Sequence, residues 1–205
     1  MCKIIPILEP KSVIPFAGSY IIGGKNYYKN NYLGTTTWDE CADFLKQNLK
    51  FKINVVTLRE NQTFDILNQL QLEKYERLDL DDMKKYIESI KDHKYEYEKD
   101  DEPDISKLVE DSELASKKMS ERLKRFNAEL NTNVFIQIKD KSIQIIKGKD
   151  EDRKLFCELD NKLLRRILDR KAHWNNAEIG THITFKRYPN KMEPDTHTLM
   201  SFFHL

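Results

Sequence analysis

The sequence predicts a mixed fold, between the α/β and α+β classes, because strand-like and helix-like patterns both occur along the chain. Residues 11–24 form an apolar run that ends in small residues, which is typical of a buried strand followed by a tight loop. A β-branched run at residues 53–58 predicts a second strand. With the helix expected between them, the first seventy residues predict a β-α-β unit, which needs neighbouring strands or helices to cover its sheet.

The helix of this unit has a clear start signal. Thr37 is a suitable N-cap, and Glu40 lies three positions later, which is the spacing of a capping box. Apolar side chains then recur at helical spacing at Cys41, Phe44, Leu45 and Leu49. The sequence therefore predicts a helix over residues 38–49.

The second half of the chain predicts a separate α+β domain. Helical spacing of apolar residues extends over residues 105–130, and period-2 alternation over residues 134–145 predicts a β-hairpin. Residues 155–159 predict a third strand, and residues 163–168 a short amphipathic helix. The densely charged stretch before this domain predicts a boundary. We therefore expect three parts, which are residues 1–72, a charged helical linker at 73–104, and residues 105–205.

Composition excludes several classes of function. Lys and Arg (35) nearly balance Asp and Glu (34), so the long-range positive field that non-specific nucleic-acid binding uses is missing. No apolar run approaches the ~20 residues of a membrane span, and no signal peptide is evident. The three cysteines are far apart, so we expect reduced thiols and a cytoplasmic location.

The residues that could carry chemistry do not form a recognisable active site. His173, His182, His197 and His204 lack the spacing of a helical zinc site, which favours ordinary hydrogen-bonded histidines. The glycines near Lys25 match neither a P-loop nor a dinucleotide fingerprint, and Ser19 is not in a nucleophile elbow. Residues 173–180 concentrate flat, hydrogen-bonding side chains, which suits either a polar pocket wall or a buried turn. We expect no catalytic residue and no metal ligand in this chain.

Several segments nevertheless resemble a known family. Residues 14–18 (Ile-Pro-Phe-Ala-Gly), 24–26 (Gly-Lys-Asn) and 32–34 (Tyr-Leu-Gly), ahead of a Thr-rich helix start, resemble the last β-α-β portion of the metallo-β-lactamase fold. The resemblance is to the lactonase-like and sugar-nucleotide hydroxylase-like branch, which is often associated with surface-polysaccharide pathways. Residues 173–180 and 185–190 are similar to the tail domain of such proteins, which also resembles a sterol-carrier-like domain. The resemblance implies a terminal β-α-β part of a metallo-β-lactamase-like sandwich, then a tail with a helix, a three-stranded antiparallel sheet and further helices.

The resemblance also implies what this chain lacks. Family members bind zinc or iron through a His-x-His-x-Asp-His cluster and later ligands, but no histidine precedes His93 here. The last family histidine would fall at residues 33–36, where none occurs. A metal-activated water needs several ligands and an open coordination position, so the chain is expected to be inactive alone. The expected partner is either a missing N-terminal metal-binding half or another copy of the chain.

Two functions follow as hypotheses. The first is the C-terminal portion of a metal-dependent hydrolase, in which residues 18–31 and 173–180 border a cleft for a small anionic or sugar substrate. Lys and Arg suit phosphate or carboxylate, and Asn suits hydroxyl groups. The second is a non-catalytic adaptor whose tail domain holds an apolar ligand or a protein partner. The side chains expected to contact substrate are Lys25, Asn26, Asn30, His173, Asn175, Asn176 and Arg187.

Overall fold

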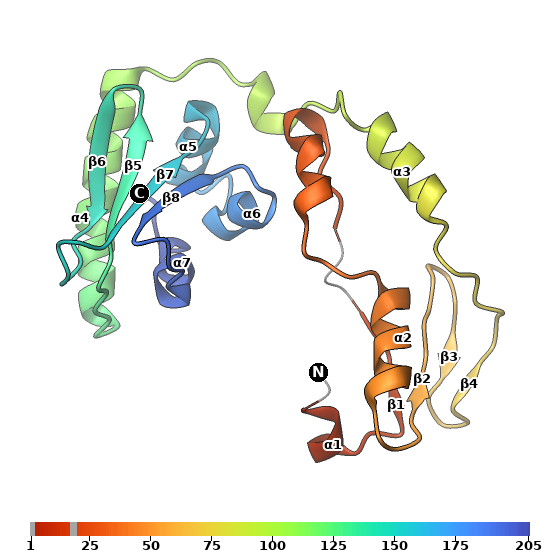
Figure 1. The fold of residues 1–205 in the computed structure, drawn as a ribbon. Helices are drawn as coiled ribbons and strands as arrows, with labels where there is room; N and C mark the ends of the chain where they lie inside the picture. The colour runs from red at the N-terminus through yellow and green to blue at the C-terminus, as the bar shows by residue number, and fades with distance from the viewer. Residues whose placement is uncertain (1–2, 17–19) are drawn as a thin grey trace. The chain divides into compact units, whose positions relative to one another are not determined.

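The structure is a computed structural model that describes residues 3–16 and 20–205 of the chain. It mixes helix and sheet, as expected from the sequence. The chain divides into two compact units (Figure 1). Unit 1 comprises the described residues of 1–23 and 27–92, and unit 2 comprises residues 24–26 and 93–205. The predicted loop residues Gly18 and Ser19, and Cys2, lie outside the described residues.

Unit 1 contains the predicted strand–helix–strand order. Strand β1 (Ser12–Val13) pairs in parallel with β2 (Asn54–Val55), and α2 (Trp38–Asn48) connects them. Of the apolar run at residues 11–24, which was predicted to be a strand followed by a loop, only the two residues of β1 pair with β2. The core of this pair is small and consists of Ile5, Ala42, Leu45 and Val55.

The other elements of unit 1 are short. Helix α1 (Ile5–Leu8) precedes β1, and the 3-10 helix η1 (Gly24–Tyr32) begins in unit 2 and continues in unit 1. Strands β3 (Phe64–Asp65) and β4 (Leu70–Gln71) form a small antiparallel hairpin. Helix α3 (Leu80–Ser89) follows and buries none of its side chains. Unit 1 therefore has little interior of its own.

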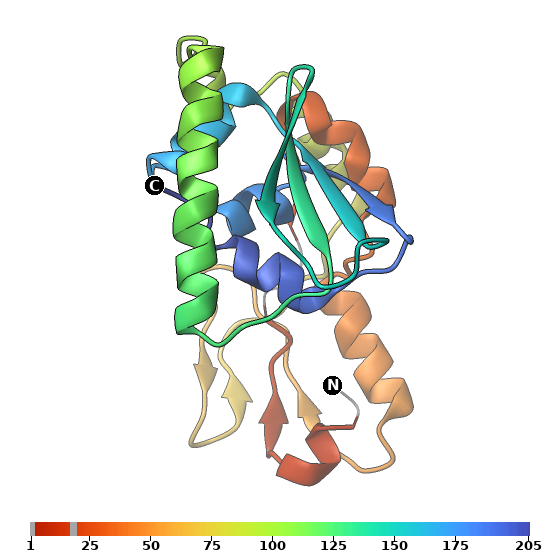
Figure 2. The ribbon, with the colours of Figure 1, turned by 90° about the vertical axis from the view of Figure 1, so that its left-hand side faces the viewer.

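Unit 2 is built on a four-stranded sheet in the order β6-β5-β7-β8 (Figure 2). Strands β5 (Asn133–Ile138) and β6 (Lys141–Ile146) form the predicted hairpin. Strand β7 (Lys154–Glu158) pairs in parallel with β5, and β8 (Thr184–Tyr188) pairs antiparallel with β7. The prediction of a three-stranded antiparallel sheet is therefore wrong in the number of strands and in the direction of β7. The direction differs because the chain crosses over after β6 and pairs β7 with the other edge of β5.

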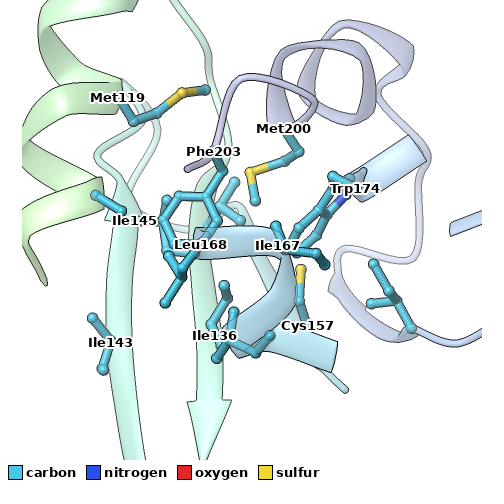
Figure 3. Packing of buried hydrophobic residues seen from close by; sticks show 14 of the residues in the cluster. Met119, Ile136, Ile143, Ile145, Cys157, Ile167, Leu168, Trp174, Met200 and Phe203 are labelled. Atoms are coloured by element: carbon cyan, nitrogen blue, oxygen red, sulfur yellow. The ribbon is translucent and has the colours of Figure 1, made fainter. Parts of the chain in front are cut away.

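The helices of unit 2 bury the inward side chains of the sheet. They are α4 (Ile105–Arg125), α5 (Asn161–Leu168), α6 (Trp174–Ile179) and α7 (Pro194–Met200), with the short η2 (Glu96–Lys99) before α4. Val134, Ile136 and Ile138 on β5 are fully buried, whereas the alternating Phe135 and Gln137 are only half-buried. Figure 3 shows side chains from all four helices meeting the sheet: Met119 from α4, Ile167 and Leu168 from α5, Trp174 from α6 and Met200 from α7.

Candidate functional site

Lys25 and Asn26 lie in unit 2, where both side chains contact residues far along the sequence. The Lys25 Nζ atom is 3.2 Å from a carboxylate oxygen of Glu98 and 3.2 Å from one of Asp160. The amide of Asn26 donates a hydrogen bond to the carbonyl oxygen of Thr181 at 3.2 Å. These contacts attach residues 24–26 to unit 2.

The charge of Lys25 is already balanced within the structure. Partial burial acts to lower the pKa of this ammonium group, but the carboxylates of Glu98 and Asp160, together with Tyr97, raise it well above its ordinary value. The ammonium also lies 5.3 Å from the centre of the Tyr97 ring. A substrate anion at Lys25 would therefore compete with two carboxylates, and the predicted role of Lys25 stays a prediction.

Two aromatic side chains that the sequence did not single out, Tyr95 and Tyr97, pack against His182. The hydroxyl of Tyr97 lies 3.1 Å from Nδ1 of His182. Tyr95 meets the same imidazole edge to face, with ring centres 4.4 Å apart, and stacks with Tyr97 at 5.9 Å. His182 is therefore a hydrogen-bonded, packed histidine, which is the role we expected for the histidines in general.

Asn30 lies in unit 1 and is occupied by the backbone. Its side-chain oxygen accepts from the Ile22 amide at 2.8 Å, and its nitrogen donates to the carbonyls of Ile22 at 2.7 Å and Tyr27 at 2.6 Å. These bonds close the turn between residues 22 and 30, so the geometry gives Asn30 a structural task. Contact with a substrate hydroxyl stays a prediction.

The polar segment around residues 173–180 forms helix α6. Trp174 and Ala177 are buried, whereas His173, Asn175 and Asn176 are exposed on the solvent side of unit 2. Because the apolar pair anchors the helix, the three polar side chains are left exposed. They remain available to a ligand, and nothing in the geometry brings them together with Lys25.

Arg187 belongs to a half-buried chain of polar groups in unit 2. Its guanidinium lies 3.4 Å from Nε2 of His197 on α7, and Nδ1 of that imidazole lies 2.5 Å from a carboxylate oxygen of Glu178 on α6. The guanidinium also lies 5.3 Å from the ring centre of Phe185. The Arg187 guanidinium and the Glu178 carboxylate therefore lie beside opposite nitrogens of one imidazole. From the sequence, only Arg187 was expected to contact substrate, His197 was expected to be an ordinary hydrogen-bonded histidine, and Glu178 was not singled out.

Unit 1 contains two apolar hollows. One has a volume of about 600 Å³ and the other about 490 Å³, and Trp38 and Leu78 line both. The indole nitrogen of Trp38 donates to the Tyr75 hydroxyl at 2.7 Å, and this hydroxyl donates to the buried carboxylate of Asp39 at 2.9 Å. The side chain of Trp38 is thus held in place between two hollows of ligand-binding size.

Within the described residues, no three His, Cys, Asp or Glu side chains lie close enough together to hold a metal ion. Cys157 is buried, and burial raises the pKa of its thiol far above the ordinary value, which keeps it protonated and unreactive. None of the described helices is both long and apolar enough to cross a membrane. Zinc or iron, implied by the family resemblance, remains an expectation for a complete fold.

Comparison with protein-family models, with curated proteins and with solved structures gave no match for this chain. The resemblance to the metallo-β-lactamase fold therefore depends on the sequence segments quoted above.

Proposed function

We propose that the chain is a non-catalytic portion of a metallo-β-lactamase-fold, metal-dependent hydrolase, in which unit 1 docks against a polypeptide that carries the metal ligands. The observation that supports this proposal is the apolar surface that the segment directly after β1 leaves in solvent. Ile14, the residue after β1, is 40% exposed, and Phe16, two positions further on, is 90% exposed. Large apolar side chains gathered at a strand end mark a surface that a partner covers.

The backbone of this pair also supports docking. Among the described residues, β1 and β2 pair only with each other, so each strand has an edge with unpaired backbone groups. A two-stranded sheet is marginal in water, and further strands are the usual way to stabilise it. A partner that adds a strand to either edge would pair the backbone and cover the apolar side chains together.

The size of the surface is sufficient for association. The hollow of about 600 Å³ is lined by Ile14, Pro15, Phe16 and Leu58 beside Trp38, so a partner can insert apolar side chains there. Burial contributes ~25 cal/mol for each Å² of apolar surface, so a few hundred Å² contribute several kcal/mol before the entropic cost of association. The proposal also includes a small anionic or sugar substrate and a role in surface-polysaccharide or sugar-nucleotide metabolism. Both are supported by the sequence resemblance alone.

Sedimentation velocity of the full chain over a range of concentrations tests the docking surface. We expect the wild-type chain to associate, and Phe16→Asp and Ile14→Asp to reduce this association. Ile179→Asp is the matched control, because Ile179 is 56% exposed but lies on α6 of unit 2. Ile22 is unsuitable for such a change, because it is only 3% exposed and a charge there would disrupt unit 1.

Co-expression identifies the partner. The candidate is any polypeptide encoded beside this gene that carries the His-x-His-x-Asp-His cluster, and we expect it to form a stoichiometric complex that Phe16→Asp weakens. A wild-type chain that stays monomeric at high concentration and does not bind such a polypeptide would contradict the proposal.

The second candidate is a binding module for an apolar ligand. Its supporting observation is that the two hollows lined by Trp38 and Leu78 are in unit 1 and are mainly apolar. A hydrophobic fluorescent dye tests this function. One-to-one binding to the monomeric wild-type chain, lost in the Leu78→Asp variant, would favour it over docking.

A further inference from the structure

We propose that unit 2 contains a binding site for a small oxyanion, the phosphate or carboxylate group of a ligand, at the end of the sheet where β7 begins and β8 ends. A pocket of about 20 Å³ opens there. Its charged lining comprises Arg153, Lys154, Arg187, Lys191 and Glu193, and the imidazole of His197 also lines it. All of these residues belong to unit 2, so the site does not depend on the docking of unit 1.

The lining has an excess of positive charge. Its carboxylate, Glu193, forms an ion pair with Arg153 and accepts hydrogen bonds from the hydroxyls of Thr132 at 2.5 Å and Thr196 at 3.4 Å. Glu193 is therefore fully engaged at one side of the pocket. In the described part of the chain, no carboxylate lies within ion-pairing distance of Lys154, Arg187 or Lys191, and these three cations face the same small space.

Arg187 gives the strongest indication of a missing partner. Its Nε atom is buried and has no hydrogen-bond partner in the described structure, while one terminal nitrogen of the guanidinium lies 3.4 Å from Nε2 of His197. A guanidinium has five N–H donors in a planar fork that fits the two oxygens of a carboxylate or phosphate. Leaving a buried donor unpaired costs stability, and an oxyanion in the pocket would remove this cost.

The size of the pocket selects an anionic group rather than a whole ligand. A volume of about 20 Å³ admits little more than a water molecule or a few ligand atoms. The pocket borders Tyr188, which is 58% exposed, so the remainder of the ligand can extend over the sheet surface. The geometry therefore assigns Arg187 to the oxyanion, with Lys154 and Lys191 supplying further positive charge.

The alternative is that Arg187 has a purely structural role, packing on Phe185 and against His197. The two roles predict opposite effects of Arg187→Met. If Arg187 serves a ligand, burying its charge without that ligand destabilises the fold. Its replacement by an apolar side chain should then leave the unfolding temperature unchanged or raise it. A structural arginine should lower the unfolding temperature when it is replaced.

Titration calorimetry and thermal unfolding of the full chain, with inorganic phosphate and with acetate against chloride at equal ionic strength, test the site. We expect at least one of the two oxyanions to bind and to raise the unfolding temperature, and Arg187→Met to weaken this binding at least tenfold without lowering the unfolding temperature in chloride. Whichever oxyanion binds more tightly identifies the ligand's anionic group.

Lys117→Gln is the matched control, because it removes one positive charge from an exposed position on α4 that does not line the pocket. It should leave oxyanion affinity unchanged. Lys191→Met removes an exposed pocket cation and should weaken binding several-fold, which keeps the test valid if Arg187→Met fails to fold. The proposal is overturned if the wild-type chain binds neither oxyanion, if Lys117→Gln weakens binding as much as the pocket variants, or if the pocket variants bind as the wild type does.

Discussion

Glu178 and His197 join the two short helices α6 and α7, with a carboxylate oxygen 2.5 Å from the imidazole Nδ1. The His197 side chain is 8% exposed and that of Glu178 is 22% exposed, so solvent screens this contact only weakly. Glu178→Gln should lower the free energy of unfolding of unit 2 by about 1–3 kcal/mol, because it removes the charged partner of a buried polar group. Urea denaturation measures the loss, and the exposed Glu110→Gln on α4 is the control, for which we expect no change. Equal effects of the two substitutions would show that the contact does not stabilise the fold.

The stability of unit 1 should depend on the side chain that caps the N-terminus of α2. The Thr37 hydroxyl accepts a hydrogen bond from the Glu40 amide at 3.2 Å, and the Glu40 carboxylate accepts from the Thr37 amide at 2.8 Å. Thr37→Ala should destabilise unit 1 by about 1 kcal/mol, whereas Thr37→Ser, which retains the hydroxyl, should restore most of the loss. Circular dichroism during urea denaturation measures both. A serine variant as unstable as the alanine variant would contradict the capping role.

This helix shows what the sequence can predict. The capping box and the apolar stripe are local signals, since all their residues lie within one element, and α2 begins where they indicate. The same holds for the hairpin of β5 and β6, whose period-2 alternation is a property of neighbouring residues.

The pairing of distant segments was not predictable in this way. Strand β8 lies at a sheet edge. Because it contains Lys186 and Arg187, its sequence lacks the apolar alternation that marks a half-buried strand. The parallel pairing of β7 with β5 depends on how residues 147–153 cross between them, which no local pattern encodes. Sheet order therefore had to come from tertiary structure.

In the candidate sites too, local sequence does not predict which distant residues come together. Lys25 was recognisable as a cation in a glycine-containing loop, but its partner Asp160 is 135 positions away. Glu178 and His197 are ordinary residues in sequence, and only the packing of α6 against α7 makes them neighbours of Arg187. Residue type predicted the chemistry that each side chain can perform, and the fold decided which side chains act together.

Gly24 should tolerate no side chain. Its φ of +59° is in the left-handed region, and a Cβ atom would lie 2.5 Å from the carbonyl oxygen of His93 and 2.9 Å from the Tyr95 ring. Gly24→Ala should therefore destabilise unit 2 by about 1 kcal/mol or more. Gly34→Ala is the matched control, because a Cβ there meets no atom within 4 Å. Thermal unfolding of the two variants compares them, and similar unfolding temperatures would contradict the close approach at Gly24.

The carboxylate of Glu193 should make unit 2 sensitive to acid. Hydrogen bonding from Thr132 is the largest cause that lowers the pKa of this group, and Arg153 lowers it further. Because the pKa is lower in the folded than in the unfolded chain, the stabilisation is fully present above the unfolded pKa, near 4.3, and is lost as the pH falls through the folded value. Glu193→Gln should reduce stability at neutral pH and flatten the decline below about pH 4. Unfolding free energies measured from pH 7 to pH 2 test this, and parallel pH profiles for the two proteins would refute it.

The boundary of unit 2 gives the last prediction. The sequence placed the tail domain at residues 105–205, whereas the continuous part of unit 2 begins at His93, with residues 24–26 added from earlier in the chain. Residues 93–104 contribute the buried Tyr97 to the main core, and Asp100 pairs with Arg166 of α5 through two hydrogen bonds of 2.5 and 2.8 Å.

A fragment of residues 93–205 should therefore unfold cooperatively, and one of residues 105–205 should be less stable by several kcal/mol, because it loses a buried aromatic side chain and leaves Arg166 without its carboxylate. Chemical denaturation compares the two fragments. Tyr97→Ala and Asp100→Asn in the longer fragment assign the loss to the core contact or to the ion pair. If the shorter fragment were as stable as the longer one, residues 93–104 would be a linker, as the charge pattern of the sequence suggested, and the core contact of Tyr97 would contribute little to the fold.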